Sequence, residues 1–574
     1  MDVLRLEVLW NRLLSVVNEQ QVTLMRTAFS TVVRESQDLA CGVFDRNANM
    51  MAQSLTGTPG HINTMATGMR HFMDAHPPDT LEPGDVLITN DPWQTAGQIN
   101  DMTVVTPVFH RGRVVAFFAS CCHSPDVGGR VYGGGANEIY EEGIRIPIMH
   151  LMRRGEPNET LVRMIRANVR VPDETIGDLW AQMACNDVGG RDLVHFLEEF
   201  DLPDCEELSA EIIRRSEGAL REAIRALPDG TYTHEAWSDG FNDIPVKIAV
   251  AVTIAGDEVH IDYTGSSEQS PSGINVVLNY TQAYSSFAIK SALNPEVPHN
   301  EGAFRPVTTT APPGSILNCR EPAAVAARHL IGHMLPCTIF GALAKAMPGR
   351  LMAGGAESSW LTVWRGTWPG REDLFTFTLF QSGGAGARAS KDGLQTNGFP
   401  SGVAGVPAEV YETRTPLVMH RKELRQDSGG AGRWRGGLAQ QTESSYRGDG
   451  YWGVSTIIDR LKFAGQPIDG GKPGVIGEYV LGSGEHPPAK TLVPLKLDDH
   501  VHLRLAGGAG YGDPLTRAPE LVLRDVVLGF VSVEAAERDY GVAIRYTGGP
   551  DRLVRLPEHY AIDDEETARL RAGS

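Results

Sequence analysis

The stretch DVLITNDPWQTAGQINDMTVVTPVFHRGRVVAFFASCCHSPDVGG (85–129) decides the fold class and contains most of the candidate functional residues. Its runs DVLITN, TVVTPVF and VVAFFAS are rich in β-branched and aromatic residues, and loops of Gly, Asp, Asn and Pro separate them. Short apolar runs bounded by turn-forming residues predict β-strands. Each run stops beside polar side chains, so the ends of these strands are where a site is expected.

Helical and strand-rich segments alternate around this block. Residues 3–27 have apolar side chains at helical spacing and predict a long amphipathic helix. Residues 157–227 are mainly helical, and KIAVAVTIAGDEVHIDYTG (247–265) predicts two strands joined by a Gly-Asp turn. A further β-rich section covers about 450–505, and a helical tail follows it. The expected fold class is α+β, with mixed β-sheets, packed helices and many Gly-rich loops.

The length predicts more than one folded unit, because single hydrophobic cores stop growing at roughly 250–300 residues and this chain has 574. We expect an N-terminal region with the candidate metal site and a helical segment (1–230). A middle β-rich domain (231–410) and a C-terminal β-rich region with a helical tail (411–574) should follow.

Composition excludes several classes of function. With 52 Lys and Arg against 71 Asp and Glu, the formal net charge is −19, which disfavours binding to nucleic acid or to anionic membranes. No apolar stretch approaches the roughly 20 residues of a membrane span, and no secretory signal pattern is present. The seven cysteines form no C-x-x-C pair, which argues against a disulfide framework or a zinc finger. A cytoplasmic protein with reduced thiols is expected.

Two glycine-rich segments resemble nucleotide-binding loops without matching them. FTFTLFQSGGAGARAS (375–390) runs from a strand into glycines, but no apolar helix follows, and AGGAGYGDP (506–514) is stopped by Asp-Pro. Neither segment fits a dinucleotide or P-loop fingerprint. We therefore predict tight backbone packing at these glycines, and no ATP site on this chain.

Five polar residues from three segments form the candidate site. Asp38 precedes an apolar run, Gln98 and Asp101 lie three apart in a loop, and His123 follows a strand with Asp126 three residues later. Oxygen and imidazole groups from separate loops are how a protein builds an open metal site. The alternative is that His123 is an ordinary core histidine and that the Asp residues are turn formers.

The sequence resembles the hydantoinase B/oxoprolinase family, which includes B subunits of ATP-dependent hydantoinases, N-methylhydantoinases and caprolactamases, and related ketone carboxylase subunits. The resemblance covers nearly the whole chain. The matching motifs are RESQDLACGVFD (34–45), EPGDVLITNDPW (82–93), NDMTVVTPVFHRGRVVAFFAS (100–120), CHSPDVGG (122–129), NVRVPDETIGDLWAQ (168–182), DYTGSSEQSPSGIN (262–275), NEGAFRPV (300–307), PAEVYETRTPLVMHRKELRQDSGGAGRWRGG (407–437), GAGYGDPL (508–515) and ERDYGV (537–542).

The resemblance implies a divalent metal, zinc or manganese in different branches of the family. Its ligands map onto Asp38, Asp101 and His123, but where the family usually has His this chain has Gln98. A neutral amide oxygen is a weaker zinc ligand than imidazole, so the site would favour Mn²⁺ or Mg²⁺, or would be weakened or lost. We expect the three ligands to converge on one ion and Gln98→His to tighten zinc binding.

The same resemblance implies an activity that needs a partner. A hydantoinase A-like subunit would use ATP to activate a cyclic amide such as a hydantoin, 5-oxoproline or a lactam, and this chain would complete metal-assisted hydrolysis in a hetero-oligomer. Asp126 would orient His123 or accept a proton; otherwise it is a turn residue of the DVGG bend. Two alternatives stay open: a subunit of an ATP-dependent ketone carboxylase, and a non-catalytic partner with a degenerate metal site.

Overall fold

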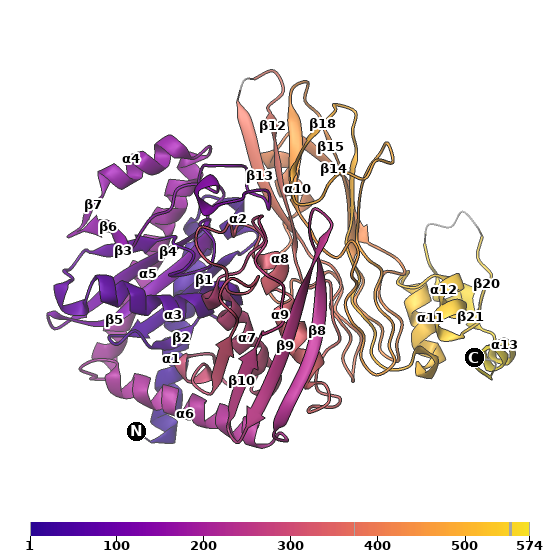
Figure 1. The fold of residues 1–574 in the computed structure, drawn as a ribbon, viewed down its shortest axis with the longest axis horizontal. Helices are drawn as coiled ribbons and strands as arrows, with labels where there is room; N and C mark the ends of the chain where they lie inside the picture. The colour runs from indigo at the N-terminus through magenta and orange to yellow at the C-terminus, as the bar shows by residue number, and fades with distance from the viewer. Residues whose placement is uncertain (1, 372, 550–553, 573–574) are drawn as a thin grey trace.

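The computed structural model describes residues 2–371, 373–549 and 554–572, and confirms the α+β prediction. Its N-terminal part is built on an antiparallel seven-stranded sheet in the order β2-β1-β5-β4-β3-β6-β7 (Figure 1). The strands are β1 (Leu39–Asp45), β2 (Met50–Gln53), β3 (Val86–Thr89), β4 (Asp101–His110), β5 (Arg113–His123), β6 (Met149–Arg153) and β7 (Glu156–Pro157).

Helices cover both faces of this sheet because its central strands are apolar on both sides. In β1, Leu39 and Cys41 join the core beneath α1 (Val3–Thr27) and α5 (Pro172–Glu199). The alternate residues Ala40 and Phe44 join the core beneath α3 (Pro59–Ala75) on the other face. The predicted helix 3–27 is thus confirmed with those bounds. The other helices of this part are α2 (Thr31–Arg34), α4 (Glu159–Asn168) and α6 (Glu206–Arg225).

The middle of the chain forms a four-stranded sheet in the order β11-β10-β9-β8. The predicted pair of strands around Gly256-Asp257 is present as β9 and β10. The helix α7 packs against α3 of the N-terminal part and against α9, which covers β8 and β9. The elements are β8 (Gly230–Phe241), β9 (Ile244–Ala255), β10 (Glu258–Asp262), α7 (Leu278–Leu293), β11 (Val307–Thr310), α8 (His329–Gly332) and α9 (Leu335–Leu343).

Two four-stranded sheets, β13-β12-β16-β18 and β14-β15-β19-β17, share one aromatic-rich core and form a sandwich (Figure 1). The first sheet contains strands on both sides of residue 410, and the domain boundaries proposed at 230 and 410 stay predictions. The elements are β12 (Trp360–Thr367), β13 (Leu374–Gln381), α10 (Ala408–Arg414), β14 (Leu417–Leu424), β15 (Gln440–Tyr446), β16 (Trp452–Ile457), β17 (Glu478–Leu481), β18 (Leu492–Leu495) and β19 (Val501–Arg504).

Glycine-rich segments run side by side next to the sandwich. Backbone N–H groups of Gly437 and Gly508 donate to the carbonyls of Ala385 and Gly437, at 2.8 and 2.9 Å. A Cβ added at Gly384 would lie 1.9 Å from the Gly437 carbonyl oxygen, which leaves no room for a side chain. These glycines therefore serve close backbone packing, as predicted.

The chain ends in a small unit at the edge of the sandwich, at the right of Figure 1. Its elements are α11 (Pro519–Val527), α12 (Val533–Tyr540), β20 (Ile544–Tyr546), β21 (Tyr560–Ile562) and α13 (Asp564–Ala572). All seven cysteines are buried and unpaired. Within the described ranges, no helix has both the length and the apolar character needed to cross a bilayer.

Candidate functional site

Strand register brings three of the predicted site residues to one end of the large sheet. The strands β1, β5 and β4 are neighbours and antiparallel, so the start of β1, the end of β5 and the start of β4 lie together. Asp101 is the register partner of His123, and the backbone N–H of His123 donates to the carbonyl of Asp38 at 3.2 Å. The loop before β4 adds Gln98.

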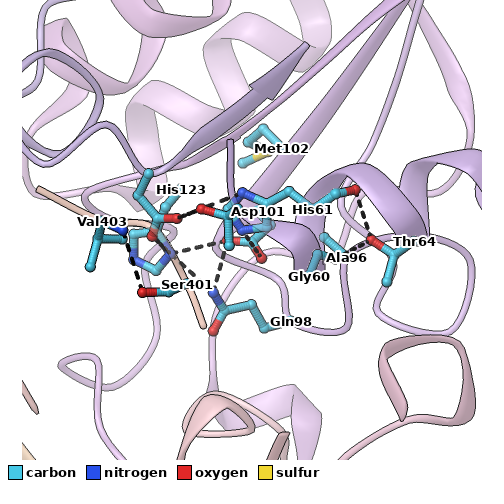
Figure 2. Close-up of polar contacts among 12 residues, drawn as sticks. Gly60, His61, Thr64, Ala96, Gln98, Asp101, Met102, His123, Ser401 and Val403 are labelled. Atoms are coloured by element: carbon cyan, nitrogen blue, oxygen red, sulfur yellow. Dashed lines mark hydrogen bonds and ion pairs between the residues drawn. The ribbon is translucent and has the colours of Figure 1, made fainter. Parts of the chain in front are cut away.

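Asp101 is the centre of a buried polar cluster (Figure 2). Its Oδ1 lies 2.8 Å from Gln98 Nε2 and 3.0 Å from His123 Nδ1. Its Oδ2 lies 3.0 Å from His61 Nε2 and forms an ion pair with Arg328. Asp101 has no exposed surface, so these four partners replace water around a fully buried carboxylate.

Asp38 lies at the edge of the same cluster. Thr58 donates its hydroxyl to Asp38 Oδ1 at 3.0 Å. The nearest imidazole nitrogens are His61 Nδ1 at 3.7 Å from Oδ1 and His123 Nδ1 at 4.0 Å from Oδ2. The structure therefore brings together Asp38, Gln98, Asp101 and His123, as the sequence spacing suggested.

His61 and Arg328 were not predicted as site residues. His61 lies in the first turn of α3, and Arg328 immediately precedes α8, more than 200 residues after Asp101 in the chain. Both side chains are almost completely buried. Both residues stand among apolar neighbours in the sequence, in GHINTMAT and AARHLIGH. This was the signal that could have found them, because a charged group that is buried needs a partner.

The charges in the cluster shift each other's pKa values. Burial raises the pKa of Asp101, but His61, Arg328 and the hydrogen bonds from both histidines outweigh it and hold this pKa well below its usual value. Burial lowers the pKa of His61, but the carboxylates of Asp101 and Asp38 hold it above its usual value. An ionised Asp101 between cationic partners follows from these directions.

Three glycines make room for Arg328 and for the Tyr280 ring that packs against it. Its guanidinium carbon lies 4.1 Å from the centre of the Tyr280 ring. A Cβ at Gly60 or Gly332 would approach that ring to 2.5 or 2.4 Å, and one at Gly97 would approach Arg328 Cδ to 2.9 Å. The cation–π pair is therefore held between backbone segments that cannot carry side chains.

The cluster borders a cavity of about 20 Å³, also lined by Ser401 and Val403. Two nitrogens in the cluster, His61 Nδ1 and His123 Nε2, have no hydrogen-bond partner within the described part of the chain. A space of this size holds about one water molecule. A larger ligand would need the wall of the cavity to move.

Asp126 lies apart from the centre of the cluster. Its carboxylate accepts from the side chain of Arg170, with Nη1 at 2.6 Å, from the backbone N–H of Arg170, and from the backbone N–H of Gly128 at 3.2 Å. His123 Nδ1 instead contacts Asp101 and Gln98. The structure thus places Asp126 in the bend that holds Arg170.

Gln98, Asp101 and His123 make a set of contacts that hydrogen bonds alone cannot satisfy. Gln98 Nε2, Asp101 Oδ1 and His123 Nδ1 lie 2.8–3.0 Å from one another. If His123 Nδ1 accepts from the Gln98 amide, it faces the Asp101 oxygen with a lone pair; if it donates to Asp101, its N–H faces the amide N–H₂. A cation among three acceptors would remove this conflict.

The side chains of Gln98, Asp101 and His123 fit a divalent ion as ligands once the Gln98 amide turns. Across the described ranges, no three His, Cys, Asp or Glu side chains are already placed to hold an ion. Turning the Gln98 amide by half a turn would bring Oε1 beside Asp101 and His123. The hydroxyl of Tyr132, which donates to Oε1 at 2.9 Å, could then accept from Nε2. Spacings near 3 Å suit adjacent ligands at about 2.1 Å from one ion.

Comparison with known proteins gives the family. Residues 2–514 match the model of the hydantoinase B/oxoprolinase family. The chain belongs to this family. Across 95% of both chains it is 30% identical to a Pseudomonas protein named as the B subunit of a D-/L-hydantoinase. It is 29% identical to the beta subunit of the caprolactamase of Pseudomonas jessenii, over 96% of this chain and 98% of that protein.

Two solved structures share the whole fold. The crystal structure of the ATP-dependent caprolactamase of Pseudomonas jessenii superposes with a TM-score of 0.88 at 28% identity, covering 100% of each chain. A nucleotide-free acetone carboxylase structure superposes with a TM-score of 0.85 at 20% identity, covering 99% of this chain and 82% of the other. The second likeness shows that the architecture extends to a carboxylase.

Proposed function

We propose that this chain is the beta-type subunit of an ATP-dependent hydrolase that opens a cyclic amide such as a hydantoin, 5-oxoproline or a lactam. The observation that carries the proposal is the buried cluster at the ends of β1, β4 and β5, in a chain whose relatives include a hydantoinase subunit and a caprolactamase subunit. Seven buried free thiols suit the cytoplasm, where thiols stay reduced.

The chain should act with an ATP-binding subunit of the hydantoinase A type in a hetero-oligomer. Amide resonance makes the ring carbonyl a poor electrophile, and transfer of the γ-phosphoryl group of ATP to the amide oxygen relieves this. Water then adds to the activated carbon, the C–N bond breaks with protonation of the nitrogen, and a second water releases inorganic phosphate. The products are the ring-opened acid or carbamoyl acid, ADP and phosphate.

The side chains of the cluster supply the proton transfers. His61 Nδ1 is free at the cavity, and a protonated His61, held between the carboxylates of Asp101 and Asp38, would return a proton to the leaving nitrogen. Asp101 holds both rings through their other nitrogens. Asp126 would position Arg170 through their ion pair, and its role as a proton acceptor stays a prediction.

Asp38, Gln98, Asp101 and His123 would hold a divalent ion, manganese, zinc or magnesium. Such an ion, when bound, lowers the pKa of water and polarises a substrate oxygen. Elemental analysis of the purified chain tests this directly, and Gln98→His should retain more zinc after dialysis because imidazole is the better zinc ligand. Failure of both proteins to retain manganese, zinc or magnesium would contradict the assignment.

Activity is tested by co-expression with the ATP-binding subunit and a panel of hydantoin, N-methylhydantoin, 5-oxoproline and caprolactam, with product mass as the readout. Asp101→Asn should lower kcat about 100-fold or more. The matched control Asp173→Asn, at an exposed ion pair, should leave it unchanged. ATP-dependent turnover by this chain alone, or turnover only of a ketone with bicarbonate, would overturn the proposal and, in the second case, assign a carboxylase.

A further inference from the structure

A second cavity lies beside the polar cluster, between the N-terminal part and the sandwich. Its volume is about 570 Å³, within the range of small-molecule sites. One wall is the glycine-rich loop 129–136, and the opposite wall is formed by Arg365 of β12, Ser455 of β16 and Lys490. Ser455 donates to the Tyr132 carbonyl at 2.8 Å and so fixes the loop against the sandwich.

The lining of this cavity is strongly cationic. It includes Arg130, Arg170, Arg365 and Lys490, with Glu142 as its one carboxyl group. Burial raises the pKa of Glu142 to about 8, so this group is neutral at pH 7. Its Oε1 accepts two backbone N–H groups at 2.8 Å, whereas Oε2 is buried without a partner. A protonated Oε2 is a hydrogen-bond donor.

The carboxylates that balance these cations do not line the cavity. Asp126 pairs with Arg170, Glu141 with Arg130, and Asp459 lies 3.3 Å from Lys490 Nζ. Arg365 differs from the other three. Among the residues that the structure describes, it has no ion pair, and its Nε is buried without a hydrogen-bond partner. An arginine without a partner in the wall of a cavity is a candidate site for an anion.

Tyr132 connects the two cavities. It lines the cationic cavity and also the small cavity of the polar cluster. Its hydroxyl donates to Gln98 Oε1 at 2.9 Å, and its ring meets His123 edge-on with 5.1 Å between ring centres. A ligand in the larger cavity is therefore separated from Gln98 and His123 by one side chain.

We propose that this cavity binds the phosphoryl group of the activated amide, with Arg365 as the residue that recognises the phosphate, and so holds the substrate next to the polar cluster. The proposal rests on the proposed function. A phosphoryl group offers two negative charges and three acceptor oxygens, which match arginine donors and a neutral carboxyl donor. The cluster cavity is too small for this ligand, whereas the cationic cavity has room for a ring and a phosphate.

The test uses the full chain in phosphate-free buffer and isothermal titration with two probes, inorganic phosphate and carbamoyl phosphate. Wild type should bind both, with carbamoyl phosphate the tighter because it carries the carbonyl carbon and nitrogen. Arg365→Met should weaken both about 10- to 100-fold, the effect of losing a charged hydrogen bond. Arg191→Met, an exposed arginine on α5, should change neither. Arg365→Lys carries the same test if Arg365→Met does not fold, because it keeps the charge and loses the paired donors of the guanidinium.

Three results would overturn the proposal: no binding by wild type, equal weakening by Arg191→Met, or tighter binding of inorganic phosphate than of carbamoyl phosphate. The last would make the cavity a site for free phosphate. Because titration needs neither partner nor turnover, it separates the two proposals. Binding without hydrolysis of any cyclic amide would refute the proposed function and leave the cavity as a phosphate site, whereas hydrolysis without binding would refute this proposal alone.

Discussion

Replacing Arg328 with Met should lower the free energy of local unfolding around the site by about 3–5 kcal/mol. Arg328 is 2% exposed and pairs with an Asp101 that has no exposed surface. Its Nε also donates to the Ala96 carbonyl at 2.8 Å. Methionine keeps an unbranched apolar stem but removes the charge and every donor. Breaking a buried ion pair from one side costs about 3–5 kcal/mol, because the remaining charge is left without its partner.

The assay is hydrogen exchange followed by mass spectrometry, since a chain with several cores does not unfold in one step. Peptides covering 96–104 and 325–332 should exchange about 100-fold faster or more, as a free-energy loss of 3 kcal/mol or above implies. The control Arg166→Met breaks an exposed pair with Asp173 and should cost less than about 1 kcal/mol.

A double variant separates the ion pair from simple packing. Combined with Asp101→Asn, the loss caused by Arg328→Met should be smaller than in the wild-type background, because no ionised carboxylate is left behind. Wild-type exchange rates in Arg328→Met, or strictly additive losses in the double variant, would refute the reasoning that Arg328 neutralises Asp101.

Three further changes test other parts of the structure. Asp126→Asn should lower stability by about 1–3 kcal/mol in thermal unfolding through loss of the charged acceptor for Arg170; a fall in kcat without loss of stability would instead return Asp126 to proton transfer. Gly332→Ala should destabilise by about 1–3 kcal/mol because its Cβ would lie 2.4 Å from Tyr280, whereas Gly218→Ala, with open space around it on α6, should be neutral or stabilising. The pKa of Glu142 is about 8 in the folded chain and about 4.5 in the unfolded chain, so the free energy of unfolding falls as pH rises between these values. Glu142→Gln should therefore gain melting temperature relative to wild type between pH 5 and 8. Parallel curves of melting temperature against pH for the two proteins would contradict this.

The sequence predicted what local patterns determine. The helix 3–27 and the strands around Gly256 follow from spacing within one segment, and the structure confirms both. The close backbone packing of the glycine-rich segments was also predicted, because clustered glycines are a local feature of the sequence. Asp38, Asp101 and His123 could be grouped because each stands at the end of a strand-like run.

The rest of the site depends on contacts between distant segments. His61 enters the cluster from a helix on the face of the sheet, and Arg328 comes from the connection before α8. Neither position follows from the spacing of the motif residues. Asp126 shows the same limit, since its partner Arg170 lies 44 residues further along the chain and determines what its carboxylate does.

The order in which the ribosome makes the chain has a consequence for this site. Asp38 and Asp101 emerge long before Arg328, the cation that neutralises Asp101, and before Val403, which closes the cavity. At about 5–20 residues per second, the interval from Asp38 to Val403 is on the order of tens of seconds. During that time the large sheet can form with two acids and two histidines still open to solvent. Until Arg328 and Val403 have been made, the polar cluster lacks the cation that neutralises Asp101 and one residue of its cavity wall.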